Sequence, residues 1–182
     1  MDIRRVGLAH PDAVRLVAAL QEQYTSMYGV PDETHADAAG FEPPRGAFFV
    51  GYLDDVPVAS GGWRFRGDLA AFGTSPVTEV KRMYVVPQAR GQGLGRRMLE
   101  HLERTAREAG SPAMVLETGT RQPEAIALYR SRGYTRYRRY GRYRWSPTAR
   151  YFAKLLLDVP GRRRGPGRRG IRRRGSAPGA AS

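Results

Sequence analysis

The chain has 182 residues, 41% of them hydrophobic, and a formal net charge of +14, which suits one basic domain of α/β or α+β class with a real core. No run approaches the roughly 18 apolar residues that a membrane span requires, and Met1 leads into no signal-like segment, so a cytoplasmic protein is expected. The absence of cysteine excludes disulfides, thiolate zinc sites and a cysteine nucleophile.

The first half of the chain predicts a strand, a helix and a hairpin. Residues 3–6 are typical of a short strand. Residues 11–28 carry apolar side chains near helical spacing, with Pro11 in the opening turn and Gly29 at the end. Two β-prone runs, 46–53 and 56–66, flank the turn Asp54-Asp55 and predict a hairpin.

The second half predicts strands and helices around a glycine-rich loop. A strand is expected at 77–86, a helix with an apolar stripe at 96–109, a strand at 113–117, a short helix at 123–130, and one or two final strands within 134–157. The loop 90–95 then lies between a strand and a helix N-terminus. Such a place binds anions, because unpaired backbone N–H groups and the positive helix end point the same way.

The last 25 residues differ from the rest in composition. They hold eight arginines and one aspartate, a net charge of +7, among glycines and prolines. A segment with almost nothing to bury is expected to be disordered. We therefore predict a folded domain at 1–157 and an Arg/Gly/Pro-rich tail at 158–182.

The glycine loop is the most informative stretch. The backbone can approach a ligand closely at three glycines, Gly91, Gly93 and Gly95, and Arg90 adds a fixed positive charge. The expected ligand is therefore a pyrophosphate. No Gly-Lys-Ser or Gly-Lys-Thr of a P-loop is present, and residue 98 is not the third glycine that a dinucleotide fold would place there.

Two motifs carry a resemblance to a known family. Arg90-x-x-Gly93-x-Gly95, directly after Val85-Val86-Pro87, resembles the acetyl-CoA pyrophosphate motif of the GNAT superfamily of N-acetyltransferases. The stretch 122–134 (QPEAIALYRSRGY) resembles the family's later motif, with its alanine, Leu-Tyr and Gly-aromatic at this spacing. Together the motifs cover about 56 residues, from Glu79 to Tyr134, and the elements outside them follow the family's order.

The resemblance implies a fold, a cofactor and a site. The expected fold is a mixed α/β unit whose central, largely antiparallel sheet is splayed between the fourth and fifth strands and flanked by helices. Acetyl-CoA, as co-substrate, would lie in the opening, with backbone groups of Val85 and Val86 on the pantetheine. The implied cofactor-binding residues are Val85, Val86, Arg90, Gly91, Gln92, Gly93, Leu94, Gly95 and Gln122. No metal is expected, because His10, His35 and His101 lack ligand spacing.

The implied catalytic residues are Glu79 and Tyr129. Attack on a thioester requires a neutral amine, so a base or a water path must deprotonate the acceptor. Glu79 resembles the glutamate base of the family's histone-type members. It could instead pair with Lys81 on the same strand face, be merely exposed, or act through water. Glu117 is the reserve candidate. Tyr129 resembles the general acid that protonates the leaving thiolate, and packing is its structural alternative. Without cysteine, direct attack in a ternary complex is the simplest mechanism.

The acceptor is expected to be a small-molecule or protein amine, with no membrane partner. Arginines and aromatics in 134–145 favour a final strand with one buried face, and they also fit a nucleic-acid surface. Nonspecific nucleic-acid contact through the basic tail is expected to depend on salt. The alternative functions are an acyl-CoA-binding module and a nucleic-acid- or ribosome-associated protein. Pocket walls, or equally core, are expected at Tyr24, Tyr28, Phe41, Trp63, Phe65 and the segment 134–145.

Overall fold

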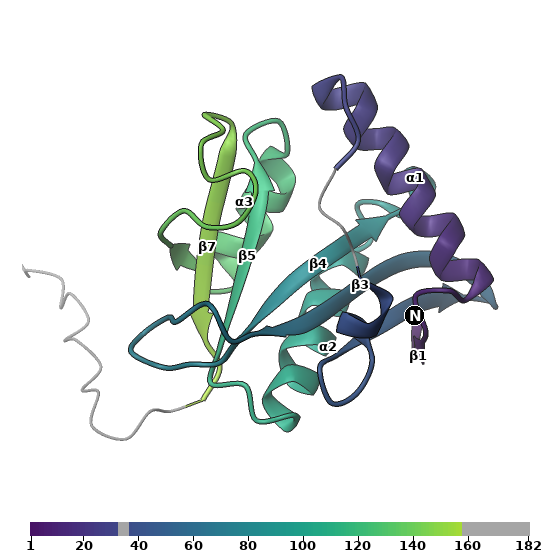
Figure 1. The fold of residues 1–182 in the computed structure, drawn as a ribbon. Coiled ribbons are helices and arrows are strands. Elements are labelled where there is room, and N and C mark those ends of the chain that lie inside the picture. The colour runs from purple at the N-terminus through teal and green to yellow at the C-terminus, as the bar shows by residue number, and fades with distance from the viewer. Residues whose placement is uncertain (33–36, 158–182) are drawn as a thin grey trace, which may run out of the picture.

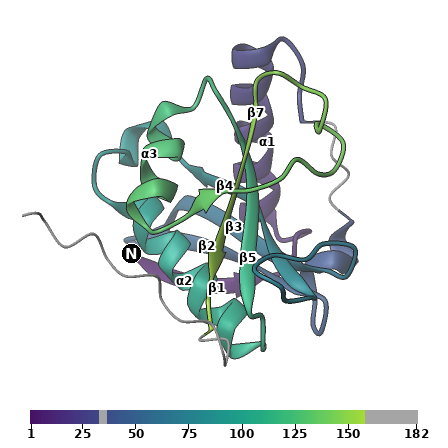
Figure 2. The same ribbon diagram turned by 90° about the vertical axis from the view of Figure 1, so that its left-hand side faces the viewer.

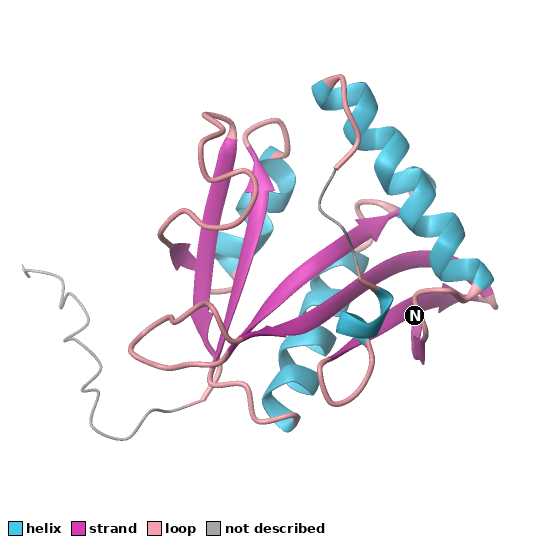
Figure 3. Cartoon of the chain, in the orientation of Figure 1, coloured by secondary structure: helices cyan, strands magenta, loops and turns pink. Residues whose placement is uncertain are grey.

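The computed structural model describes residues 1–32 and 37–157 (Figures 1 and 3). The predicted tail and the boundary after residue 157 lie outside the described part and stay predictions. The elements in chain order are β1 (Asp2–Val6), α1 (Pro11–Tyr28), η1 (Ala38–Phe41), β2 (Gly46–Leu53), β3 (Val56–Arg66), β4 (Val77–Val85), η2 (Pro87–Ala89), α2 (Leu94–Glu108), β5 (Ala113–Gly119), α3 (Pro123–Ser131), β6 (Thr135–Arg136) and β7 (Ala149–Leu155).

Within the described residues the strands form one seven-stranded sheet with the order β1-β2-β3-β4-β5-β7-β6. All neighbouring strands are antiparallel except β4 and β5, which are parallel. This arrangement confirms the predicted mixed, largely antiparallel sheet. The parallel pair is possible because α2 crosses over between its two strands.

The helices cover the sheet on opposite faces, as Figures 1 and 2 show. On one face, α1 buries Ala13, Leu16 and Leu20 against a core that includes Phe48 and Val50. On the other, the apolar stripe of α2 and part of α3 pack over β4, β5 and β7 in a core made of Val80, Met98, Leu99, Leu102, Ala106, Met114, Leu116, Tyr129 and Phe152, among others. Both faces of the central strands are therefore buried.

The sheet opens between β4 and β5. The two strands pair only at Thr78–Met114, Glu79–Val115 and Val80–Leu116. Just beyond, β4 bulges against β3, where the register shifts between Ser60 and Gly62, and Arg82 adopts φ +56°. A bulge bends its strand and strengthens the local twist, so β4 turns away from β5 here. The predicted splay between the fourth and fifth strands is confirmed (Figure 1).

The prediction for the stretch 134–145 is wrong. Only Thr135–Arg136 is strand, and 137–148 forms an irregular segment before β7. Its tyrosines at 137, 140 and 143 recur every third residue, whereas a strand alternates its faces every second residue. The segment instead turns, with Gly141 at φ +67°, and buries Tyr140 against Tyr151, with ring centroids 5.1 Å apart.

Candidate active site

A cavity of about 1200 Å³ occupies the opening between β4 and β5. Its walls come from α1, from β4 beyond Val80, from β5 after Val115, and from the N-terminal parts of α2 and α3. Residues 143–149 add the remaining wall. Past the last β4–β5 pair, the two strands no longer hydrogen-bond to each other. The backbone polar groups on their facing edges can therefore bind a ligand. The volume exceeds that of a typical small-ligand pocket and suits a long cofactor beside a second substrate.

The glycine loop forms the anion-binding end of this cavity. Gly91 and Gly93 have φ of +77° and +73°, and Gly93 precedes the first residue of α2 without any side-chain cap on the helix N–H groups. No heavy atom lies within 4 Å of a Cβ built on Gly91. The helix start thus presents open, uncapped donors, which fits the pyrophosphate of acetyl-CoA.

Two arginines, Arg90 and Arg96, flank the loop. The Arg90 guanidinium donates to the Val85 carbonyl oxygen over 3.0 Å and lies 5.8 Å from the centre of the Tyr84 ring. Arg96 and Arg121 also line the cavity. Arg90 Nη2 also donates to Gln23 Oε1 of α1 at 2.5 Å. Because neither acceptor is a carboxylate and no other acceptor is found among the described residues, the remaining N–H groups of Arg90 stay able to contact phosphate oxygens.

Most of the predicted cofactor-binding residues lie along the cavity. The ones that line it are Val85, Arg90, Gly91, Gly93, Leu94, Gly95 and Gln122. Val86 and Gln92 are outside the lining, and the Val86 N–H is already bonded to the Val58 carbonyl oxygen at 2.9 Å. The positions agree with the predicted arrangement for all but these two, while binding itself stays a prediction.

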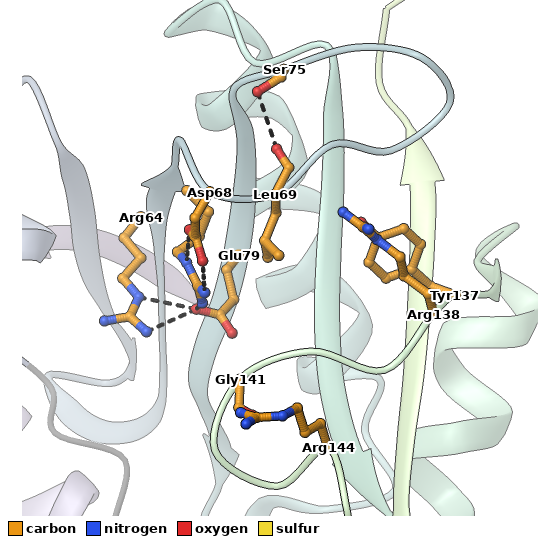
Figure 4. Close-up of polar contacts among 10 residues, drawn as sticks. Arg64, Asp68, Leu69, Ser75, Glu79, Tyr137, Arg138, Gly141 and Arg144 are labelled. Carbon is orange, nitrogen blue, oxygen red and sulfur yellow. Dashed lines mark hydrogen bonds and ion pairs between the residues drawn. The ribbon is translucent and has the colours of Figure 1, made fainter.

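Glu79 lies beside the cavity, in a buried ion network, and does not line it. Its Oε2 accepts from Nε and Nη2 of Arg64 at 3.0 and 2.9 Å and from Nη1 of Arg66 at 2.8 Å (Figure 4). Burial would raise the pKa of Glu79, but the charges of Lys81, Arg64 and Arg66 outweigh it and lower the pKa below its usual value. A carboxylate so neutralised is a weak base.

Glu117 is placed differently. It lines the cavity from β5, one residue past the last pair with β4. Burial, opposed by the charge of Lys81, raises its pKa to about 7. Tyr151 lies directly across on β7, and the interaction of its hydroxyl with Glu117 partly offsets the effect of burial on this pKa. A carboxyl group with a pKa near neutrality exchanges protons readily at physiological pH.

Tyr129 lies in the second half of α3, with its ring packed 5.8 Å from the Tyr134 ring and 6.4 Å from that of Phe152. The residue is buried by protein and also lines the cavity. Burial raises the pKa of its hydroxyl to about 12, so the phenol keeps its proton at neutral pH. Tyr129 therefore packs in the core and also carries its hydroxyl proton at the cavity wall.

Sequence reasoning missed a polar cluster at the cavity rim. Asp32, after α1, accepts from Arg82 of β4 at 2.9 Å and from the Tyr143 hydroxyl at 3.1 Å, and all three line the cavity. These residues lie 50 and 111 positions apart along the chain, and nothing in their local sequence links them. Their ties hold the end of α1 and the 137–148 segment against β4.

The aromatic residues divide between wall and core. Tyr24 and Tyr28 of α1 line the cavity, as predicted, whereas Phe41, Trp63 and Phe65 do not. Gly119 explains how Tyr28 reaches its place: a Cβ there would overlap the Tyr28 hydroxyl. Glycine at the end of β5 is thus required for the ring to pack against the strand.

The sheet, its splay and the loop at the α2 N-terminus define an acyl-CoA N-acyltransferase fold. The family model of the Acetyltransferase (GNAT) family matches residues 14–134, about two thirds of the chain, and the chain belongs to this family. A curated relative, an IAA acetyltransferase of Azospirillum brasilense, is 47% identical over 78 residues, which are 43% of this chain and 51% of that protein. The chain thus spans about half the length of this relative.

Solved structures show the same fold. A Klebsiella pneumoniae protein assigned as an acyl-CoA N-acyltransferase matches with a TM-score of 0.69 and 28% identity, over 86% of this chain and 97% of that one. An aminoglycoside 6′-N-acetyltransferase solved with coenzyme A matches with a TM-score of 0.63 and 14% identity, over 88% and 99%. At that identity the second likeness concerns the fold alone.

The described residues lack two features that mark other classes of protein. No helix within 1–32 and 37–157 has the length and apolar character needed to cross a membrane. In the same residues, no cluster of three or more His, Asp or Glu side chains could hold a metal ion.

Proposed function

We propose that this chain transfers the acetyl group of acetyl-CoA to an amine by direct attack within a ternary complex. One observation carries the proposal. A single cavity runs from the uncapped N-terminus of α2 to Glu117 on β5, with the hydroxyl-bearing Tyr129 in its wall. Acetyl-CoA supplies an activated thioester, and family membership supports its place in the splay.

In this proposal Glu117 takes the proton of the acceptor ammonium. It lines the cavity and has a pKa of about 7, raised by burial, whereas Glu79 is engaged by two arginines. Glu79 has a structural role in this proposal, because its ion pairs with Arg64 and Arg66 hold β3 against β4 beside the site. Direct proton abstraction by Glu79 stays the competing hypothesis.

Tyr129 provides the proton for the leaving sulfur. Its raised pKa keeps the hydroxyl protonated until negative charge develops nearby, which is the behaviour required of a general acid. The phenol sits in a helix packed on β5 and β7, so its position is fixed before the acceptor binds.

The test is a product screen. Purified protein is incubated with isotopically labelled acetyl-CoA and pooled amines, and labelled products are identified by mass spectrometry while free thiol is measured. The proposal expects labelled amides and thiol release in equal amounts. An acyl-CoA-binding module, the alternative, would bind acetyl-CoA but release no thiol above the background rate, and that result would contradict catalysis.

A second function, contact with a polyanion, is favoured by the surface of the 137–148 segment and its flanks. Residues 136–150 contain no acid, and five of their arginines are exposed: Arg136, Arg138, Arg139, Arg142 and Arg144. Trp145 is 79% exposed, with the Arg144 guanidinium 5.3 Å from its ring. Cations beside an exposed aromatic side chain suit single-stranded nucleic acid.

Truncation separates this surface from the basic tail. A chain ending after Leu157 loses a net charge of +7, so its retention on heparin or DNA should fall most at low salt while acetylation of a small amine stays within about twofold. Residual salt-sensitive binding is expected from the exposed arginines. Loss of small-amine turnover would instead place the tail in the active site and refute the predicted boundary at 157.

A further inference from the structure

Lys81 is the one lysine in the cavity lining, and among the described residues its ammonium has no close partner. It follows Val80 on β4, directly after the last pair with β5, so it stands at the point where the splay begins. The side chain is half-buried. Within residues 1–32 and 37–157 it forms no hydrogen bond and no ion pair within 4.0 Å.

The carboxylates near Lys81 are engaged elsewhere or are only partly charged. Glu79 is held by Arg64 and Arg66, and Asp32 by Arg82. Glu117, at the equivalent position of β5, feels the Lys81 charge, yet burial keeps it close to half-protonated at neutral pH. Lys81 acts electrostatically on Glu79 but shares that carboxylate with Arg64 and Arg66, so the groups around Lys81 supply no full counter-charge of its own. A half-buried ammonium without one is costly unless a ligand supplies it.

The walls around Lys81 and Glu117 also restrict the ligand. Tyr24, Met27 and Tyr28 of α1 and Tyr143 of the 137–148 segment all line the cavity. These side chains offer aromatic and apolar surface with few free polar groups, so they suit an apolar body. A polyamine would place further cations beside Lys81 and Arg82, where like charges repel.

We propose that the acceptor is an amino acid with an apolar side chain, whose carboxylate is bound by Lys81 while its amine faces Glu117. This inference rests on the proposed acetyl transfer and names the substrate class for the same site. The transfer forms an amide bond between the acceptor nitrogen and the acetyl carbon and breaks the thioester C–S bond. Of the two protons that the acceptor ammonium loses, one goes to Glu117 and on to solvent. The sulfur receives its proton from Tyr129, and the second proton, lost from nitrogen as the amide forms, restores the Tyr129 hydroxyl.

The experiment compares matched acceptors that differ only in the carboxylate. L-phenylalanine, L-leucine and L-methionine are each assayed against their carboxamides and against the corresponding decarboxylated amines, with thiol release as the readout. The wild-type chain is expected to use at least one acid at least tenfold better, in kcat/KM, than its amide. Acetylation of amides or decarboxylated amines with no preference for the acids overturns the inference but leaves acetyl transfer standing. Absence of turnover with every amine, including those of the product screen, contradicts the proposed function itself.

Variants of Lys81 assign the preference to its charge. Lys81→Met is expected to lower kcat/KM for the acid at least tenfold, with the amide changed by less than threefold, while Lys81→Arg keeps most of the preference. Arg5→Met, which removes one exposed charge on β1 outside the cavity lining, should leave the acid-to-amide ratio unchanged.

A role for Lys81 through the pKa of Glu117 alone would give another pattern. Removing the ammonium would then shift the pH profile and change acid and amide rates by the same factor. That result, or an unchanged acid preference in Lys81→Met, would overturn the assignment of the carboxylate to Lys81.

Discussion

Replacing Glu79 by glutamine tests whether this residue is a structural anchor or the base. The side chain is 2% exposed, and its partners Arg64 and Arg66 are 18% and 17% exposed. Removing one partner of such a buried pair costs about 3–5 kcal/mol, because the opposite charge is left without compensation. Arg66 retains Asp68 at 2.6 Å, so the lower end, about 3 kcal/mol, is expected. For a chain of this size that corresponds to a fall in Tm of about 6–12 °C.

The assay is thermal unfolding of wild type and Glu79→Gln between pH 3 and pH 8. The folded-state pKa of Glu79 is lowered, so its contribution to the free energy of unfolding is present above the unfolded-state pKa and is lost as pH falls through the folded value. The Tm difference should therefore be largest near neutrality and shrink in acid. Asp68→Asn, which removes the exposed partner of Arg66, is the control and should cost less than about 1 kcal/mol.

Activity separates the two roles of Glu79. At a temperature where Glu79→Gln is folded, kcat should stay within about threefold of wild type if Glu117 is the base. A fall of a hundredfold with intact folding would restore Glu79 as the base. A Tm within 2 °C of wild type at pH 7 would refute the reasoning from the buried ion network.

Two further residue-level predictions concern the base and the loop. Glu117→Gln should lower kcat by about 10²-fold. Because a base acts in its deprotonated form, a pKa of about 7 gives the wild-type rate a roughly tenfold rise between pH 6 and pH 8, and the variant should lose this rise. A pH profile identical to that of wild type would contradict this role. Gly93→Val places a branched side chain at φ +73° at the start of α2 and should weaken acetyl-CoA binding more than tenfold, about 1.4 kcal/mol, in a calorimetric titration. Gly110→Val, at φ +87° beyond the other end of α2, controls for backbone strain, and equal losses of affinity in both variants would remove the loop from the cofactor site.

The elements were predictable because their signals are local. The hairpin at 46–53 and 56–66 and the helix at 11–28 were expected at the bounds that the structure shows, since apolar periodicity, Pro11 and Gly29 mark them within a few residues. The splay followed from the resemblance carried by two motifs. The strand prediction for 137–148 was wrong because it followed the arginine and tyrosine content of the segment. The tyrosines recur every third residue, whereas the side chains of a strand alternate every second residue.

The surroundings of the candidate residues depend on contacts that local sequence does not encode. Glu79 stands opposite Arg64 only because of the β3–β4 register, which the bulge near Arg82 alters. Its proposed partner Lys81 acts on it electrostatically, while the ion pairs come from β3. The different environments of Glu79 and Glu117, one neutralised and one with a raised pKa, could therefore be told apart only in three dimensions.

Single-turnover transfer by Tyr129→Phe tests most directly the claim that acetyl transfer takes place in the cavity between β4 and β5. Phenylalanine keeps the ring that packs against Tyr134 and Phe152 and removes only the hydroxyl. With saturating acetyl-CoA and an acceptor found in the product screen, the transfer rate should fall at least tenfold, since general acid catalysis contributes about 10²–10⁴ in rate. The Kd for acetyl-CoA should change less than about threefold. A single-turnover rate equal to that of wild type would contradict the proposed proton donor and leave Tyr129 as a packing residue.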